Sequence, residues 1–348
     1  MSQGLQGFVG KGAGRRDVRL LFTCAGRRIE LIEAFTRAAR RLGLRPVIHT
    51  ADIQRHYAAA CVSDGVHRTP PAGDPGYVAA LARIVRRHHI DMLIPLVDTE
   101  LPVLSRARET FAGLGCAALI SPPAVIDVCR DKLQTFRFLE ARAIDTPPTW
   151  PVAEVLGGRS RCFPYFLKPR CGSASRGSFI IRGETELRAF ARIVPDGILQ
   201  RFVHGTEHTL DVYTGFDGRC RCVVPRRRLE VRGGEVTTGL TVRHAGIIRT
   251  GVRVAEALAD CVGLITIQLF LTPEGAVEVI EINPRFGGGA PLSIAAGADF
   301  PRWLLGEWQG RRPRIRLDHF REGVMMLRYH QSFFLESVRP PAPGRSGE

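Results

Sequence analysis

The sequence predicts two structural classes in one chain: a parallel α/β sheet in the first half and an α+β unit with mainly antiparallel strands in the second. Up to about residue 140, short apolar runs alternate with helical patterns, an order typical of parallel sheets covered on both faces. From residue 165 the pattern changes to closely spaced short strands separated by turn residues. A chain of 348 residues is long enough for two or three domains.

The elements of the first half follow a regular order. Strands are predicted at 18–24, 45–50, 91–96 and 116–120, and helices at 29–42, 77–88, 101–111, from 122 onward and at 131–141. Ligands of such sheets bind at the carboxyl ends of the strands, which places Arg27, Arg28, Asp52 and residues 98–100 along one crevice. Only Gly26 follows the first strand, so the glycine pattern of a nicotinamide site is absent.

The second half is predicted to contain short strands and two helices. The strands lie at 165–168, 178–182, 198–203, 209–214, 219–224, 235–242, 265–271 and 276–282, and the helices at 184–193 and 246–261. The last two strands form a hairpin. Prolines at 147, 148 and 151 indicate a linker between the halves. Residues 1–17 are Gly-rich and predict a disordered lead-in, and 331–348 predict a flexible tail.

Composition narrows the setting and the partners. The formal net charge is +15, but the arginines are scattered and no RNA-binding or helix-turn-helix signature accompanies them, so nucleic acid is not an expected partner. The nine cysteines include no Cys-x-x-Cys pair, and their odd number argues against a secreted disulfide framework, which favours a reducing cytoplasm. No stretch approaches the ~20 apolar residues of a membrane span.

A lysine followed by a loop of small residues forms the first motif. Lys168 ends a predicted strand. The loop that follows, 170–177, contains the small residues Gly172, Ser173, Ser175 and Gly177. Small residues let backbone N–H groups approach phosphate oxygens, and the lysine adds a positive charge. On these residues alone, a hairpin loop with an exposed lysine has about equal weight.

The second motif lies on the last strand of the hairpin. Alternation along a strand puts Glu281 and Asn283 on one face, opposite Ile280 and Ile282. A carboxylate and an amide oxygen two residues apart suit a hard cation.

The surroundings of this strand favour a site over a polar surface strand, which is the alternative. Gln268 on the partner strand can add another oxygen ligand. Arg285 follows on the same strand and can reach phosphate oxygens. An Asn-Pro-Arg stop followed by Phe-Gly-Gly-Gly at 286–289 is unusual for an ordinary surface strand.

The third motif is a strand that ends, turns and resumes. The first strand ends at Val203, the chain turns at Gly205, and Glu207 points back toward it. A strand edge can offer backbone groups to an adenine, and Glu207 can accept two ribose hydroxyls. His204 and His208 have the spacing of helical zinc ligands, but the glycine and the β-rich flanks argue against a helix, so zinc is rejected here.

Together these motifs resemble the ATP-grasp superfamily. The members of the pattern, in order, are Asp131-Lys132, Lys168, the glycine loop, Glu207, Gln268 and the segment 281–285. The resemblance runs from about residue 18 to about 329. The segments 23–28, 95–101 and 228–235 look like single-copy relatives of the carbamoyl-phosphate synthase large subunit, a subgroup that includes ligases of the pyrrolysine-biosynthesis type.

The resemblance implies a fold and a set of roles. It implies a Rossmann-like pre-ATP-grasp domain at 18–125, a small ATP-grasp subdomain at 126–204 and a large subdomain at 205–330. The roles it implies are phosphate contacts from Lys132 and Lys168, closure of the loop with Gly172, Ser173, Ser175 and Gly177, an adenine border at Gln200 and Val203, and ribose binding by Glu207. Gln268, Glu281 and Asn283 would hold Mg²⁺ or Mn²⁺, and Arg285 would act with Lys168 in catalysis.

Some positions depart from the pattern. Arg201 stands where many relatives carry an acid beside the adenine. Arg170 and Cys171 occupy loop positions where smaller or more flexible residues are frequent.

The implied activity is ATP-dependent ligation of a small carboxylate to an amine through an acyl phosphate, in an enzyme that is often a homodimer. One of Arg226, Arg228 and Arg243 is expected to bind the substrate carboxylate, with a solvated strand face as the alternative. Two other functions stay open: carbamoyl-phosphate-synthase-like activation of a small carboxylate, and a catalytically silent ATP-binding regulator.

Overall fold

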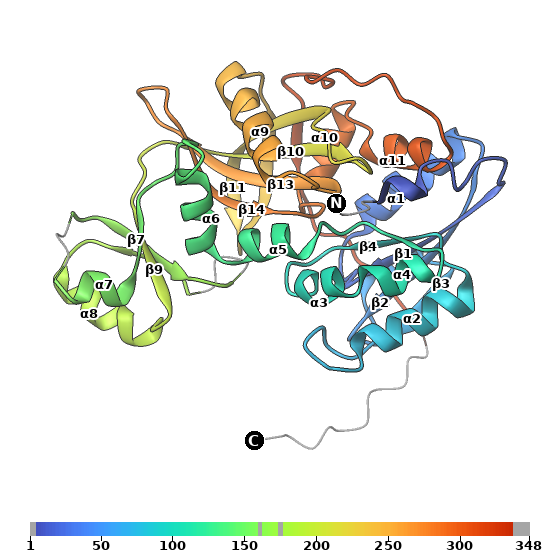
Figure 1. The fold of residues 1–348 in the computed structure, drawn as a ribbon, viewed down its shortest axis with the longest axis horizontal. Helices are drawn as coiled ribbons and strands as arrows, with labels where there is room; N and C mark the ends of the chain where they lie inside the picture. Colours follow the sequence, from blue (N-terminus) through green and yellow to red (C-terminus); the bar gives the residue numbers. More distant parts are fainter. Residues whose placement is uncertain (1–4, 159–161, 173–176, 337–348) are drawn as a thin grey trace.

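The computed structural model describes residues 5–158, 162–172 and 177–336. Its strands form a five-stranded, a four-stranded and a six-stranded sheet. We call them the N-terminal, small and large sheets. Figure 1 shows the small sheet and its helices as a lobe that stands apart, with α5 (Pro123–Arg130) and α6 (Lys132–Glu140) between it and the N-terminal lobe. No helix among the described residues is long and apolar enough to cross a membrane.

The N-terminal sheet is parallel throughout, as predicted, and its strand order is β3-β2-β1-β4-β5. Its strands are β1 (Asp17–Thr23), β2 (Arg45–Asp52), β3 (Gly65–Arg68), β4 (Met92–Pro95) and β5 (Ala117–Ala118). Its helices are α1 (Ile29–Arg41), α2 (Tyr77–His88), α3 (Leu101–Arg106) and α4 (Arg108–Gly113). The helix predicted at 101–111 is split because Ala107 leaves the helical conformation (φ −98°, ψ 11°). The strand β3 was not predicted, since half of its short run is exposed.

The small sheet is antiparallel, in the order β6-β9-β7-β8. It contains β6 (Thr149–Pro151), β7 (Tyr165–Pro169), β8 (Phe179–Ile181) and β9 (Gly197–Arg201), with α7 (Val152–Leu156) and α8 (Glu184–Ile193). The expected linker is therefore wrong from residue 149 onward. The amide of Arg201 donates to the carbonyl of Pro148 at 2.9 Å, which ties this segment to β9.

The large sheet is antiparallel, in the order β14-β13-β10-β11-β12-β15. Its strands are β10 (Thr206–Gly215), β11 (Cys222–Arg232), β12 (Glu235–Thr241), β13 (Gly263–Leu271), β14 (Val277–Asn283) and β15 (Met325–Leu327). Its helices are α9 (Ala245–Leu258), α10 (Ala290–Ala295) and α11 (Phe300–Trp308). The α+β class and the β13–β14 hairpin are as predicted.

One hydrophobic core joins the N-terminal and large sheets. Phe35 of α1 packs edge-on against Phe22 of β1 at 5.3 Å and against Phe286 at 5.6 Å between ring centroids. Tyr213 and Phe300 from the large-sheet side belong to the same buried cluster. The small sheet has a core of its own. Two lobes are thus fused by packing, whereas the third is packed separately.

The helices α5 and α6 differ from the expected division of the chain. All of α6 and most of α5 were assigned to the small subdomain at 126–204, but Cys129 and Leu139 are buried with Ile265 and Val279 of the large sheet. The apolar faces of these helices therefore cover the large sheet.

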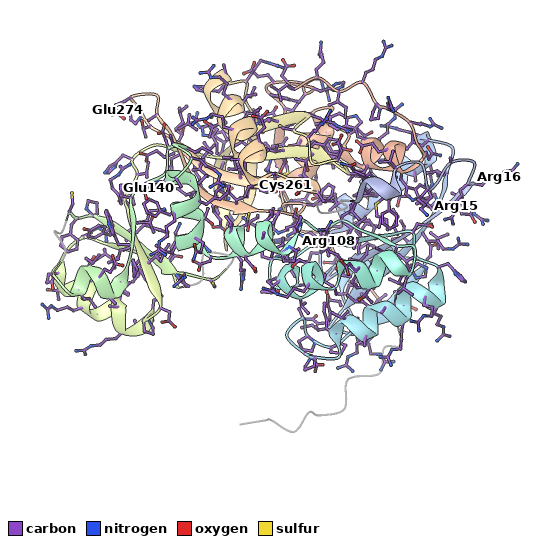
Figure 2. The ribbon with its side chains drawn as sticks, viewed as in Figure 1. Arg15, Arg16, Arg108, Glu140, Cys261 and Glu274 are labelled. Carbon is purple, nitrogen blue, oxygen red and sulfur yellow. The ribbon has the colours of Figure 1, made fainter. Side chains whose placement is uncertain are left out.

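The prediction of a disordered lead-in at 1–17 is also wrong, because the chain is folded from Leu5 onward. Leu5 and Phe8 are buried in the shared core, and a short 3-10 helix spans Leu5–Phe8. The amide of Gly12 donates to the carbonyl of Trp308 at 2.8 Å, and a Cβ on Gly12 would lie 2.2 Å from the indole ring. Arg15, labelled in Figure 2, then pairs with Asp91. Glycine therefore permits close docking rather than disorder.

Three histidines of the N-terminal lobe generate a prediction about acid stability. The rings of His49, His67 and His88 lie 4.7–5.2 Å apart, and burial lowers the pKa of all three, that of His67 to about 4. The unfolded chain binds these protons from about pH 6.5, so the free energy of unfolding should fall as pH decreases from 6.5 to 4. His67→Gln should remove about 1–2 kcal/mol of that loss, allowing for partial solvent screening.

Chemical denaturation at pH 7 and at pH 4.5 checks this. Exposed His56 provides the control, and His56→Gln should follow the parent at both pH values. Equal acid sensitivity of His67→Gln and the parent would rule out the histidine cluster as the cause.

Candidate active site

A cleft of about 850 Å³ is lined by residues of all three sheets. The predicted site residues that line it are Lys132, Lys168, Gly172, Gln200, Val203, Glu207, Gln268, Glu281, Asn283 and Arg285. Gly177 is not among the lining residues, and Ser173 and Ser175 lie outside the described part of the chain. Side chains spread over more than 150 positions of sequence thus share one cavity.

Lys168 at the end of β7 is buried, with 5% of its surface exposed. Its ammonium group donates to Gln200 Oε1 at 3.0 Å and to the carbonyl of Ile280 at 3.4 Å. The amide of Gln200 in turn donates to Thr149 Oγ1 at 2.9 Å, which fixes its orientation. Burial lowers the pKa of Lys168 to about 8, although the nearby Glu281 carboxylate opposes the shift. No carboxylate pairs with this lysine among the described residues, so its charge is available to a ligand.

A second lysine is placed by the start of α6. Asp131 caps that helix by accepting from the amides of Leu133 and Gln134, and it also pairs with Arg170. Lys132 Nζ donates to the carbonyl of Gly172 at 2.9 Å, so it lies directly at the glycine loop. The departure at Arg170 therefore has a structural reason, since its guanidinium anchors the loop to α6.

The connection between β9 and β10 presents free backbone groups to the cleft. In the described part of the chain, neither the amide nor the carbonyl of Val203 forms a hydrogen bond, although the amide of Phe202 donates to Pro164. This free donor and acceptor can form hydrogen bonds with the edge of a planar base. Arg201 forms an ion pair with Glu278 of β14, so the positive charge of Arg201 is neutralised within the protein. Burial raises the pKa of Glu207, whereas Arg228, 3.3 Å away, opposes the shift.

The oxygen ligands of the second motif converge as neighbours on β13 and β14. Gln268 lies opposite Glu281 across the two strands, and Asn283 Nδ2 donates to Glu281 Oε1 at 3.2 Å. Ile282 is buried on the opposite face, as expected. Ile280 is a correction: the strand pairing shifts next to Gln268, and the resulting bulge brings Ile280 to the cleft side.

These ligands fit a hard cation that also binds phosphate oxygens. The set consists of one carboxylate and two amide side chains. Magnesium usually takes one or two carboxylates and completes its shell with water and phosphate. Among the described residues, no group of three His, Cys, Asp or Glu side chains could hold a metal alone. The site therefore suits magnesium that arrives with a nucleotide better than zinc.

Arg285 reaches into the cleft from the end of β14 and is paired across the lobes. Its guanidinium donates to Asp98 Oδ2 at 2.6 Å, and both side chains are nearly buried. Burial opposes the charged form of Arg285, but Asp98 outweighs it and raises the pKa. The loop that carries Asp98 is held by Glu100, which accepts from the amides of Leu96 and Val97. The N-terminal sheet thus orients the arginine predicted to act in catalysis.

The three arginines expected to bind substrate each form an ion pair within the protein. Arg226 forms a buried bidentate pair with Asp211 at 2.9 and 3.0 Å. Arg228 pairs with Glu207. Arg243 pairs with Asp318 and is not among the residues that line the cleft. Arg226 and Arg228 line the cleft, so the expectation that one of these arginines binds the substrate carboxylate stays a prediction for these two.

Comparisons with known proteins agree with this geometry. Residues 129–289 match the ATP-grasp domain family, and residues 20–119 match the PylC-like N-terminal domain family. The 3-methyl-D-ornithine--L-lysine ligases of Methanosarcina acetivorans and Methanosarcina barkeri are 25% and 26% identical over 209 and 208 residues. Those alignments cover 59% and 57% of this chain and 52% of each relative, so the match spans about half the length of these relatives.

Solved structures share the fold at low identity. The L-amino acid ligase from Bacillus licheniformis has a TM-score of 0.66 at 18% identity, over 85% of this chain and 75% of its own. The N5-carboxyaminoimidazole synthetase from Staphylococcus aureus has a TM-score of 0.65 at 14% identity, over 85% of this chain and 78% of its own.

The lowered pKa of Lys168 generates a prediction about ATP. Below pH 8 the free protein carries the protonated lysine. An anionic phosphate beside it would raise its pKa back above 8. ATP binding should therefore take up protons near pH 8 and weaken by about fivefold or more between pH 7 and pH 9. Calorimetry in buffers of different ionisation enthalpy measures this uptake. Lys168→Met should bind ATP more weakly without the uptake, and an unchanged uptake would assign the proton elsewhere.

The bridge between Asp98 and Arg285 generates a second prediction. Asp98→Asn leaves a nearly buried guanidinium with a neutral partner and should lower the free energy of unfolding by about 1–3 kcal/mol. Asp127 is a matched control, because its pair with Arg106 at 3.0 Å is solvent-exposed on both sides. Asp127→Asn should change stability by about 0.5 kcal/mol or less. Urea unfolding of both variants compares them, and equal midpoints would deny the bridge a structural role.

Proposed function

Because the chain contains an ATP-grasp domain behind a PylC-like N-terminal domain and so belongs to the ATP-grasp superfamily, we propose that it is an ADP-forming carboxylate–amine ligase. The observation that carries the proposal is the convergence, in one cleft, of Lys132, Lys168, Arg285 and three oxygen ligands of the kind magnesium prefers. The free backbone of Val203 supports an adenine site, and Glu207 supports ribose binding.

The residues suggest how the reaction would proceed. A substrate carboxylate attacks the γ-phosphate of ATP, ADP leaves, and the acyl phosphate is then displaced by an amine, which forms the amide and releases phosphate. Lys168 and Lys132 would bind ATP phosphates, and Arg285 would neutralise charge on the transferring group. Catalysis would rest on positioning and charge, since no side chain needs to form a covalent bond.

Gln268, Glu281 and Asn283 would hold Mg²⁺, with Mn²⁺ as an alternative ion. The ion would draw negative charge from the phosphate oxygens that it contacts. Asn283 already donates to Glu281, which holds the two side chains on the same side of β14.

Both substrates are proposed to be amino acids. The curated relatives are named as ligases of 3-methyl-D-ornithine and L-lysine, and one structural neighbour is named an L-amino acid ligase. A cytoplasmic setting is supported by the absence of a disulfide among the nine cysteines, all of which are described and free. A homodimer stays a prediction.

The other two functions have less support. Carbamoyl-phosphate synthesis uses two ATP-grasp units, and one ATP-grasp domain is matched here. A silent ATP-binding regulator would have no need of Glu281, Asn283 and Arg285 together, and all three line the cleft.

A screen of amino acid pairs for ADP release tests the proposal. The panel pairs D-ornithine and other amino acids, as carboxylates, with L-lysine and other amines. Hydroxylamine should trap the acyl phosphate of the correct acid as a hydroxamate when ATP and magnesium are present. Release of AMP and pyrophosphate with the true substrate would contradict the proposed route, because it indicates adenylation.

Glu281→Gln tests the metal-binding strand within the same assay. The change keeps the shape of the side chain but removes the charge opposite a dication, so turnover should fall by about a hundredfold or more. Glu274 in the exposed β13–β14 turn offers a matched control, and Glu274→Gln should keep parental turnover. Turnover of Glu281→Gln within a few-fold of the parent at saturating magnesium would remove the assignment.

A further inference from the structure

Arginines from two lobes surround the glycines that follow β14. Arg28, which precedes α1, rests against this segment so closely that a Cβ on Gly288 would lie 2.5 Å from its guanidinium. Arg226 meets Gly289 in the same way, at 2.0 Å. Arg328 donates to the carbonyl of Gly288 at 2.7 Å. The glycines therefore let several cations approach one stretch of backbone.

Most of these arginines have an acidic partner within the protein. Asp211 binds Arg226, and Asp98 binds Arg285. Arg328 lies 3.3 Å from Glu30 and 3.7 Å from Glu235. Neighbouring Arg27, which is largely exposed, lies 3.6 Å from Glu235.

Arg28 is the exception. Within the described ranges, its side chain forms no ion pair and no hydrogen bond, although it lines the cleft. Burial lowers its pKa to about 10, and the positive charges of Arg285 and Arg328 add to that effect, whereas the carboxylates of Glu235 and Asp98 oppose it. The guanidinium is partly buried without a hydrogen-bonded partner, and such a position becomes favourable when an anion fills it.

The position of Arg28 separates it from the phosphate-binding lysines. Lys168 donates to Gln200 and to the carbonyl of Ile280, whereas Arg28 lies against Gly288. Arg285 pairs with Asp98 of the N-terminal lobe. The cleft thus has a phosphate end at the small sheet and a separate basic end at the N-terminal sheet.

We propose that Arg28 binds a substrate carboxylate at this end of the cleft. The inference rests on the proposed ligase function and adds a residue of the N-terminal lobe to the substrate site. A planar guanidinium suits a carboxylate because two parallel hydrogen bonds can form. The carboxylate can belong to the acid that is activated or to the amino acid that supplies the amine.

Steady-state kinetics of Arg28→Gln, with the amino acid pair that supports ADP release, tests the proposal. The KM for one amino acid should rise about 10- to 100-fold, as expected for loss of a charged hydrogen bond, while the KM for ATP stays within about threefold. Arg28→Lys keeps the charge but loses the planar fork, so its KM for that amino acid should lie between those of the parent and Arg28→Gln. Arg27 is not among the residues that line the cleft, so Arg27→Gln is the matched control and should behave like the parent.

Carboxamides identify the source of the carboxylate. If Arg28 binds the amine substrate, the parent should discriminate against L-lysinamide relative to L-lysine, and Arg28→Gln should not. If Arg28 binds the acid, both proteins should treat the two acceptors alike, and only the KM for the acid should rise in the variant. Unchanged KM values for both amino acids in Arg28→Gln would overturn the inference and leave the ligase function intact.

Binding without turnover separates the two hypotheses. Calorimetric titration of the parent and Arg28→Gln with L-lysine and D-ornithine, in the presence of ADP and magnesium, does not depend on catalysis. A parent that releases no ADP with any pair but binds one amino acid through Arg28 would refute the ligase function alone. A parent that binds neither amino acid and releases no ADP would refute both.

Discussion

The structure depends on the hydrophobic core that the N-terminal and large sheets share. Phe35 lies between Phe22 and Phe286, and Phe286 directly follows Arg285 in sequence. The same packing that fuses the lobes therefore fixes the backbone of the residue predicted to act on the transferring phosphate. Buried aromatic rings in contact resist displacement because any shift opens a cavity. The pair between Arg285 and Asp98, and the contact of Arg28 with Gly288, are precise because the core beneath them is continuous.

Electrostatic pairing explains why so basic a chain can fold around a cleft lined with cations. Each buried arginine of the cleft except Arg28 has an acid or a carbonyl oxygen beside it, and Lys168 is held by neutral oxygens. Neutral partners do not neutralise the charge of the lysine, whereas carboxylate partners neutralise the charge of an arginine. The type of partner thus distinguishes cations that stabilise the fold from cations left for a ligand.

The sequence was sufficient for the order of elements and for most of the cleft, because these depend on local patterns. Apolar periodicity located α1 and α2, and the spacing of Glu281 and Asn283 located one wall of the site. The sequence was insufficient wherever a contact between residues far apart in the chain determines the local structure. Gly-rich residues 5–17 are folded because Leu5 and Phe8 are buried in the shared core and Gly12 docks on Trp308, and the bulge at Ile280 arises from the pairing with β13. Strand order alone placed Arg28 in the crevice, but its proposed role was hidden, since an arginine without an ion pair is recognised only after the acids beside Arg226 and Arg228 are placed.

The separate core of the small sheet has a consequence for cooperativity. Its apolar residues, among them Val152, Leu167 and Leu199, pack with one another and not with the shared core. Loss of that packing would cost only its own burial energy, so this lobe can melt as an independent unit while the other two stay folded. Amide exchange would then show two levels of protection along the chain. Bound nucleotide, by spanning Lys168 and Glu281, would link the two units into one transition.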